Sequence, residues 1–299
     1  MQRMSFRIAQ NPIFVVGYPR SGTTLLQALL ATQGNLVTFP ETHFFSTVFH
    51  ENSEFRETID KDLIERLLAE ISQKSGIVFS ADITASLKRA EDFDSVSIKD
   101  FFERVILTLF PEESGPACRW LEKTPDHGLC LEHIYRFYPE AKFIGIVRNP
   151  LFSIKSRTRY FAPRTKNVLQ ELSSQWVQHL ERFEQFQETN PYSAFLIKYE
   201  NLTRNPEEVI ARVCQFLQIE FQPEKLEKYQ EKANNIIQPF EYWKKDVKDS
   251  RIYTRDGEAQ GLFSLRDVLK IQYIVLEKMK QYGYEPQRPI LQSIYNLLA

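Results

Sequence analysis

Cysteine is scarce in this chain, and long apolar runs are missing. The 299 residues include three cysteines, Cys118, Cys130 and Cys214, which are odd in number and share no metal-ligand spacing. They predict reduced thiols in a cytoplasmic protein rather than a disulfide framework. No run of about 18 apolar residues occurs, and residues 1–10 have no apolar core of the signal-peptide kind. We therefore expect no membrane partner.

An excess of charge is also lacking. The 38 basic and 39 acidic residues leave a net charge of −1. Nothing therefore attracts the chain as a whole to nucleic acid or to an anionic surface, and we expect no nucleic-acid partner. Any anionic ligand has to be held by a local arrangement of groups.

Short apolar runs alternate with amphipathic segments along most of the chain. Buried strands are expected at 12–17, 119–122, 141–147 and 193–197, and helices at 23–33, 129–137, about 168–190, 206–217 and 265–282. This alternation predicts an α/β fold with a central parallel sheet flanked by helices. Residues 1–299 are expected to form a single domain.

A helical insertion is expected at about 43–113. Apolar residues recur at helical spacing over 60–73, and a second helix is expected to begin at Ser97. The insertion is compatible with either a dimer surface or a substrate lid. The sequence does not indicate an oligomeric state.

A glycine-rich loop, GYPRSGTT at 17–24, follows the first expected strand and opens the first helix. Such a loop turns backbone N–H groups toward an anion at a helix N-terminus. The Walker A pattern requires a lysine where this chain has Thr23, and a cation stands instead at Arg20 inside the loop. The strand at 141–147 is followed by Arg148, where a P-loop NTPase usually has an acidic metal ligand. These features favour a phosphate-rich ligand bound without metal over the alternative of a P-loop small-molecule kinase.

Two segments resemble the donor-binding motifs of one enzyme family. PRSGTTLL resembles the 5′-phosphosulfate loop of the sulfotransferases that use 3′-phosphoadenosine 5′-phosphosulfate (PAPS), and IVRNPLFSIKSR resembles their 3′-phosphate motif. Residues 195–219 also resemble the strand, loop and helix that follow in that family, so the resemblance covers roughly 12–220. It implies a P-loop NTPase-like sulfotransferase fold, PAPS as co-substrate, 3′,5′-ADP as product and no required metal.

The resemblance assigns donor-binding roles residue by residue. The loop residues Arg20, Ser21, Gly22, Thr23 and Thr24 are expected to hold the phosphosulfate. Arg148 and Ser156, eight residues apart, match the pair that holds the 3′-phosphate. Tyr199 matches a tyrosine that lies near the nucleotide in this family. The other interpretation is that Tyr199 is only a partly buried aromatic residue.

Catalytic roles follow from the same resemblance. Lys123 is expected to contact the bridging oxygen or the sulfuryl group, together with Arg20. Small-molecule cytosolic relatives have a histidine two residues after this lysine, but this chain has Pro125. Tyrosylprotein and heparan-type relatives use a glutamate after the first helix, and Glu41, 21 residues beyond Arg20, matches it. We expect a desolvated Glu41 with a raised pKa to act as base. The alternative bases are His43 and His127.

The remaining candidates are less specific. The run WKKDVKDSR at 243–251 offers Lys245, Lys248, Ser250 and Arg251 for a late loop that closes over the nucleotide. The aromatic residues Phe44, Phe45, Phe49, Tyr160 and Phe161 are expected either to line an acceptor pocket or to belong to the core. The expected acceptor is a small molecule, such as a natural product, with a hydroxyl or amine. Tyrosyl peptides and glycans are the alternative acceptors. An alternative function for the whole chain is that of a nucleotide-binding protein without catalysis.

Overall fold

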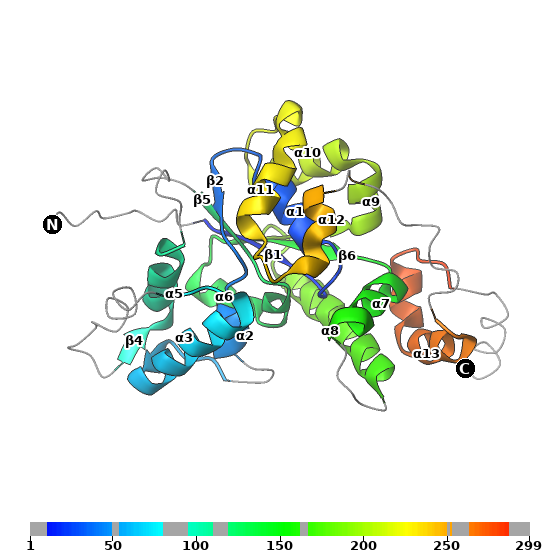
Figure 1. The fold of residues 1–299 in the computed structure, drawn as a ribbon, viewed down its shortest axis with the longest axis horizontal. Helices are drawn as coiled ribbons and strands as arrows, with labels where there is room; N and C mark the ends of the chain where they lie inside the picture. Colours follow the sequence, from blue (N-terminus) through cyan, green and yellow to red (C-terminus); the bar gives the residue numbers. More distant parts are fainter. Residues whose placement is uncertain are drawn as a thin grey trace.

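The core is a five-stranded parallel sheet in the order β2-β5-β1-β6-β7 (Figure 1). The computed structural model describes residues 11–49, 54–79, 95–109, 119–161, 167–249, 252 and 263–286. The strands are β1 (Ile13–Val16), β2 (Leu36–Thr38), β5 (Arg119–Lys123), β6 (Lys142–Val147) and β7 (Ala194–Lys198). The predicted parallel sheet is therefore confirmed, while β2 was not predicted.

Strand register brings the strand ends to one edge of the sheet. Val15 lies opposite Lys123, Val16 opposite Gly145, and Val147 opposite Lys198. Because all five strands are parallel, the segments that follow them emerge on the same side. The glycine-rich loop, the segment after Lys123 and the segment after Val147 are thus neighbours.

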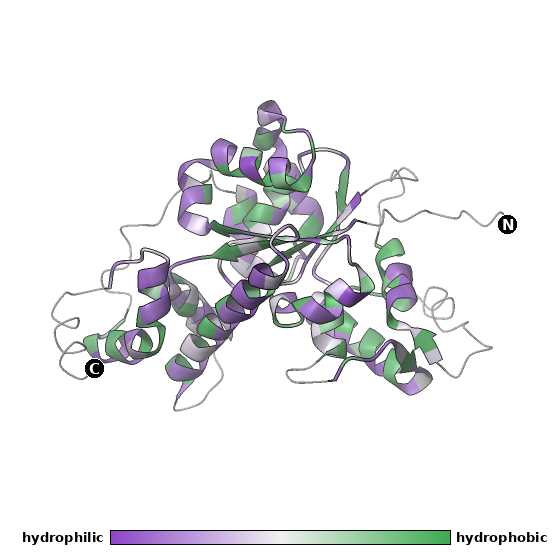
Figure 2. Cartoon of the chain, turned by 180° about the vertical axis from the view of Figure 1, so that it is seen from behind, coloured by the Kyte–Doolittle hydropathy of each residue, from purple (hydrophilic) through white to green (hydrophobic). Residues whose placement is uncertain are grey.

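Alternate residues of the strands face two separate apolar layers. Phe14 and Val16 of β1 pack into one layer, and Ile13 and Val15 pack into the other. The helices that cover the first layer are α2 (Phe44–Val48), α5 (Ile98–Leu107), α6 (Leu131–Phe137) and α8 (Val168–Thr189). Those that cover the second layer are α1 (Thr23–Leu30), α10 (Pro206–Leu217), η2 (Pro223–Lys228) and α11 (Tyr229–Ile236). Figure 1 shows these groups on opposite faces of the sheet, and Figure 2 shows the hydrophobic strands between them.

The expected insertion at 43–113 is not only helical. Its described part contains α2, α3 (Lys61–Ser75) and α5, but also an antiparallel pair of strands, β3 (Thr58–Asp60) and β4 (Ser95–Ser97), which was not predicted. Both helices that follow these strands have side-chain caps. Asp60 accepts from the backbone N–H of Leu63 at 2.7 Å, and Ser97 accepts from that of Asp100 at 3.4 Å. A polar cap satisfies N–H groups that the first helical turn leaves open.

Short elements complete the edge where the strands end. They are η1 (Pro125–Leu129), α7 (Pro150–Phe161), α9 (Tyr199–Arg204), η3 (Tyr242–Lys244) and α12 (Lys245–Asp249), while α13 (Leu265–Gln281) packs against α8. Among the described helices, none has the length and apolar character needed to cross a membrane. Cys130 and Cys214 are buried free thiols, and Cys118 lies outside the described residues.

Candidate active site

The loop at 17–24 is packed tightly against the ends of β6 and β7. Gly22 has a φ of 98°, and a Cβ there would lie 2.3 Å from Cδ2 of Tyr199. Gly17 has a φ of 150°, and its Cβ would lie 2.5 Å from the carbonyl oxygen of Ile146. Only glycine fits such contacts, because a side chain would displace its neighbours. The two glycines therefore set how closely the loop approaches the sheet.

A cleft of about 990 Å³ opens beside this loop. Its basic lining residues are Arg20, Lys74, Arg148, Lys155, Arg157, Arg159, Lys244 and Lys245, and its acidic ones are Glu41, Asp126, Glu241 and Asp246. The cleft thus concentrates positive charge on a chain whose net charge is −1. Such a surface favours a ligand that carries several negative charges.

Most of the predicted site residues meet in this cleft. Its lining includes Arg20, Gly22, Thr23, Thr24, Glu41, Arg148, Ser156 and Tyr199. The two remaining predicted residues are buried beside it. Ser21 has an exposed fraction of 0% and lies 3.5 Å from the hydroxyl of Ser153, and Lys123 contacts Glu41.

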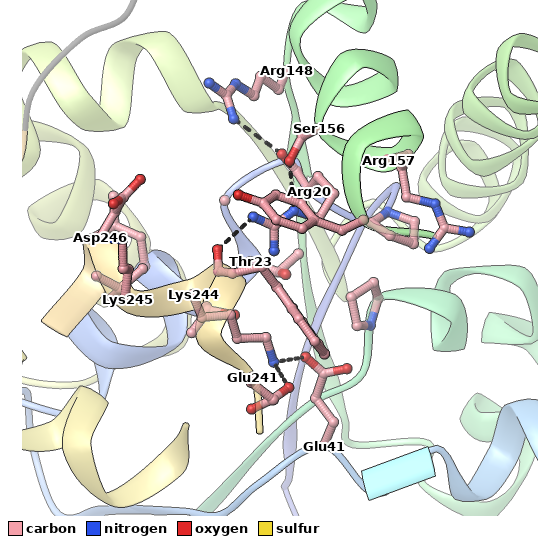
Figure 3. Close-up of a pocket in the computed structure, with 18 of the residues that line it drawn as sticks. Arg20, Thr23, Glu41, Arg148, Ser156, Arg157, Glu241, Lys244, Lys245 and Asp246 are labelled. Atoms are coloured by element: carbon pink, nitrogen blue, oxygen red, sulfur yellow. Dashed lines mark hydrogen bonds and ion pairs between the residues drawn. The ribbon is translucent and has the colours of Figure 1, made fainter. Parts of the chain in front are cut away.

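The two motifs join at Arg20. Its Nε donates to Oγ of Ser156 at 2.9 Å, and its carbonyl oxygen accepts from Nη1 of Arg148 at 3.2 Å (Figure 3). The Arg148 guanidinium lies 4.1 Å from the ring centre of Tyr199, which holds it by a cation–π contact. Burial and then the neighbouring Arg148 lower the pKa of Arg20 to about 10. Arg20 therefore keeps its charge at neutral pH, and an anion between the two guanidiniums would relieve their repulsion.

Glu41 is surrounded by cations. Its Oε1 contacts Nζ of Lys123 and lies 2.6 Å from Nζ of Lys244, and its Oε2 lies 3.4 Å from Nε2 of His43. Burial alone would raise the pKa of Glu41, but Lys123, Lys244 and His43 together hold it well below its usual range. The expectation of a raised pKa is therefore wrong. Burial in turn lowers the pKa of Lys123 to about 8 against the opposing effect of Glu41.

His127, one of the alternative bases, lies outside the cleft. It is fully buried, its Nε2 accepts from the backbone N–H of Phe45 at 3.1 Å, and its Nδ1 lies 2.8 Å from Oε2 of Glu122. Because Nε2 accepts, the ring is a neutral tautomer whose Nδ1–H donates to Glu122. Both nitrogens are occupied, so His127 serves the structure. His43 does line the cleft, and burial lowers its pKa against the effect of Glu41.

The aromatic and late candidates separate into three groups. Phe44, Phe45 and Phe49 are buried in the core, so they do not line an acceptor pocket. Tyr160 and Lys245 do line the cleft, whereas Nζ of Lys248 donates to the carbonyl oxygen of Ile237 at 3.1 Å. Ser250, Arg251 and the side chain of Phe161 lie outside the described residues.

Sequence reasoning named the run at 243–251 but not Lys244, although this part of the run reaches both Arg20 and Glu41. The carbonyl oxygen of Trp243 accepts from Nη2 of Arg20 at 2.9 Å, and Lys244 bridges Glu41 and Glu241. The basic run at 243–251 was the available signal. It did not indicate which of its lysines turns inward.

Comparison with known proteins assigns the family. The sulfotransferase family model matches residues 12–223, so the chain belongs to the sulfotransferase family and is an enzyme of that class. A putative protein-tyrosine sulfotransferase of Caenorhabditis briggsae is 27% identical over 218 residues, covering 72% of this chain and 68% of the relative. A protein-tyrosine sulfotransferase of Drosophila melanogaster is 24% identical over 211 residues, covering 69% of this chain and 38% of the relative.

Solved structures show the same fold. The sulfotransferase domain of the Synechococcus PCC 7002 olefin synthase has a TM-score of 0.65 at 20% identity and covers 95% of this chain and 98% of the domain. The sulfotransferase domain of the curacin biosynthetic pathway has a TM-score of 0.59 at 22% identity and covers 93% of this chain and 99% of that domain. A mouse sulfotransferase complexed with PAP has a TM-score of 0.52 at 14% identity and covers 92% of this chain and 86% of the mouse chain. The predicted fold and family are therefore confirmed.

Proposed function

We propose that this sulfotransferase takes its sulfuryl group from PAPS and transfers it to a hydroxyl or amine. The observation that carries the proposal is the junction at Arg20, where two motifs about 125 residues apart in sequence meet. Two guanidiniums, a serine hydroxyl and a helix N-terminus converge there, and these are donors that phosphate oxygens accept. The close approach of Gly22 to Tyr199 leaves no side chain of the loop between them. These residues fit a ligand with two separate phosphate ends.

The donor-binding roles follow from this arrangement. The N–H groups of the loop, with the hydroxyls of Thr23 and Thr24, are suited to the 5′-phosphosulfate. Arg148 and Ser156 are suited to the 3′-phosphate, and Tyr199 orients Arg148. Bound PAPS supplies an activated sulfuryl group, and 3′,5′-ADP is left after its transfer.

The catalytic roles belong to Glu41, Lys123 and Arg20. A bond forms between the acceptor oxygen or nitrogen and sulfur, the bond from sulfur to the bridging oxygen breaks, and its electron pair stays on the 5′-phosphate. The acceptor proton passes to the carboxylate of Glu41, which is ionised at neutral pH and therefore able to take it. Lys123 and Arg20 stabilise charge on the leaving oxygen and the sulfuryl oxygens.

For the acceptor, we favour a small molecule such as a natural product. The names of two structural neighbours, an olefin synthase and the curacin pathway, support this class. A second candidate is a tyrosyl peptide, which the names of the two animal relatives favour. The buried free thiols of Cys130 and Cys214 support a cytoplasmic location.

Calorimetry with nucleotides tests the donor. We expect the protein to bind 3′,5′-ADP at least tenfold more tightly than ATP, a difference of about 1.4 kcal/mol, and to do so with or without magnesium. The alternative kinase requires a lysine in the place of Thr23 and a bound magnesium ion. ATP binding equal to or tighter than 3′,5′-ADP binding would show that the proposal is wrong.

A further inference from the structure

A short turn beyond the family match contacts two groups of the proposed site at once. The family model ends at residue 223, whereas the turn consists of residues 241–244. The carbonyl oxygen of Trp243 accepts from Nη2 of Arg20 at 2.9 Å, and Nζ of Lys244 donates to Oε1 of Glu41 at 2.6 Å. Nothing in the match that assigns the family accounts for this turn.

An ion pair and hydrogen bonds between residues of the same segment hold the turn in place. Glu241 contacts Nζ of Lys244 through Oε1, and its Oε2 accepts from the backbone N–H of Gln238 at 2.9 Å. The backbone N–H of Lys244 also donates to the carbonyl oxygen of Glu241 at 2.8 Å. Lys244 and Glu241 are 8% and 11% exposed, so solvent screens their contact weakly. Figure 3 shows Lys244 reaching between Glu241 and Glu41.

The turn is also anchored to the helical insertion. Gly76 ends α3 with a φ of 69°, and a Cβ at Gly76 would lie 2.1 Å from Cε1 of Phe240. The ring of Phe240 therefore rests directly on the backbone of Gly76. This contact fixes the residue just before Glu241.

Four charges alternate through this part of the site, in the order Lys123, Glu41, Lys244 and Glu241. Their sum is zero while Glu41 is ionised. When Glu41 takes a proton from the acceptor, both lysines lose its charge, but Lys244 keeps Glu241. Only Lys123 is then left with uncompensated charge within this group of four.

We propose that Lys244 and Glu241 are positioning residues for Glu41: Lys244 fixes the carboxylate, and Glu241 retains Lys244 when Glu41 becomes protonated. This inference rests on the proposed role of Glu41 as base. It adds a part of the site that the motifs at 17–24 and 146–157 do not contain.

The two residues have opposite effects on Glu41, which gives the test its sign. Lys123 on β5, Lys244 on η3 and His43 on its own segment face the Glu41 carboxylate, and Arg20 acts on it from further away. Lys244→Met removes one cation, so Glu41 should titrate at higher pH than in the wild type. Glu241→Gln removes the competitor for Lys244, so Glu41 should titrate at lower pH. General loosening of the fold would not produce this difference.

The experiment follows the carboxyl carbons of the 299-residue chain, labelled with ¹³C-glutamate, by NMR as pH is varied. Glu41→Gln assigns the signal, Lys244→Arg should restore the wild-type titration, and Lys278→Met is the matched control. Lys278 forms a partly buried ion pair with Glu184 between α13 and α8, away from the cleft. Its loss should leave the Glu41 titration unchanged.

Two outcomes overturn the proposal. One is a Glu41 titration that does not move in Lys244→Met, and the other is a Glu41 titration that stays unchanged or moves upward in Glu241→Gln. Calorimetry of the same samples with 3′,5′-ADP separates this result from the proposed function. Failure of the wild type to bind 3′,5′-ADP would contradict the proposed donor, whatever the titration shows.

Discussion

Replacing Glu122 with glutamine removes a charge from a fully buried network behind the site. The carboxylate accepts from Oγ1 of Thr42 at 2.9 Å, from Oγ1 of Thr124 at 2.7 Å and from Nδ1 of His127 at 2.8 Å. Thr124 in turn accepts from the backbone N–H of His43 at 3.1 Å. The network therefore ties the segment after Glu41 to the segment after Lys123.

The size of the effect follows from the three hydrogen bonds that side chains donate to Glu122. A hydrogen bond to a charged group contributes about 1.5–3 kcal/mol, and a neutral one about 0.5–1.5 kcal/mol. Losing the charge at three bonds should therefore cost about 3 kcal/mol of the free energy of unfolding. The glutamine also has an N–H₂ group that cannot accept from Nδ1 of His127. Since a domain is stable by about 5–15 kcal/mol, the variant should still fold.

The effect should depend on pH in a defined direction. Burial alone would raise the pKa of Glu122, but its partners His127, Thr124 and Thr42 outweigh burial and lower it. A lowered folded pKa gives stability that is present in full above the unfolded value of about 4.3 and is lost as pH falls toward the folded value. The difference between wild type and Glu122→Gln should therefore shrink below about pH 4.3.

Urea unfolding followed by tryptophan fluorescence measures this difference at pH 7 and at steps down to pH 3. Glu70→Gln is the control, because the exposed ion pair of Glu70 with Lys74 should contribute about 0–1 kcal/mol. An equal loss at pH 7 and pH 3 would refute the claim that Glu122 is ionised. A loss no larger than that of Glu70→Gln would refute the claim that the network stabilises the site.

Two further predictions concern the loop and the base. Gly22→Ala adds a Cβ 2.3 Å from the Tyr199 ring and should weaken 3′,5′-ADP binding at least tenfold in calorimetry, which is about 1.4 kcal/mol. Gly34→Ala, whose Cβ at a φ of 55° meets nothing closer than 3.6 Å, is the matched control, and an equal effect on binding would contradict the steric argument. Glu41→Ala should lower the rate of sulfuryl transfer by about 10²–10⁴-fold, with little change in 3′,5′-ADP affinity. A normal rate would assign the base elsewhere, and His43→Ala would then test the alternative.

The sequence predicts the parts of the fold that depend on long apolar patterns. The strands at β1, β5, β6 and β7 and the helices α8, α10 and α13 were expected within a few residues of their observed bounds. The strand β2 was missed because its three residues, Leu36–Thr38, are too short to show a pattern. The strands β3 and β4 have three residues each as well, and their pairing joins positions about 37 residues apart. Such pairings depend on tertiary contacts.

In the site, too, features that depend on local sequence were predicted, whereas features that depend on distant residues were not. Arg20, Arg148 and Ser156 were expected around one nucleotide, because loops after parallel strands meet at one edge of the sheet. Their direct contacts with one another were not predicted. The position of Glu41 in the cleft was also expected, but the direction of its pKa shift was not. Lys123 lowers this pKa most, and the next cation, Lys244, lies 203 residues further along the chain. Burial can be guessed from a sequence, whereas a partner so distant cannot.

Lys244 and Lys245 illustrate why this partner was missed. The two residues are adjacent and chemically identical, yet Lys244 is 8% exposed and bridges two carboxylates, while Lys245 is exposed at the rim of the cleft. The chain changes at this point from the 3₁₀ turn η3 to the helix α12. These helices have about 3.0 and 3.6 residues per turn, so the inward-facing position cannot be extrapolated through the junction. It is set by the ring of Phe240 on Gly76 and by the carboxylates of Glu41 and Glu241, which select the lysine that reaches them.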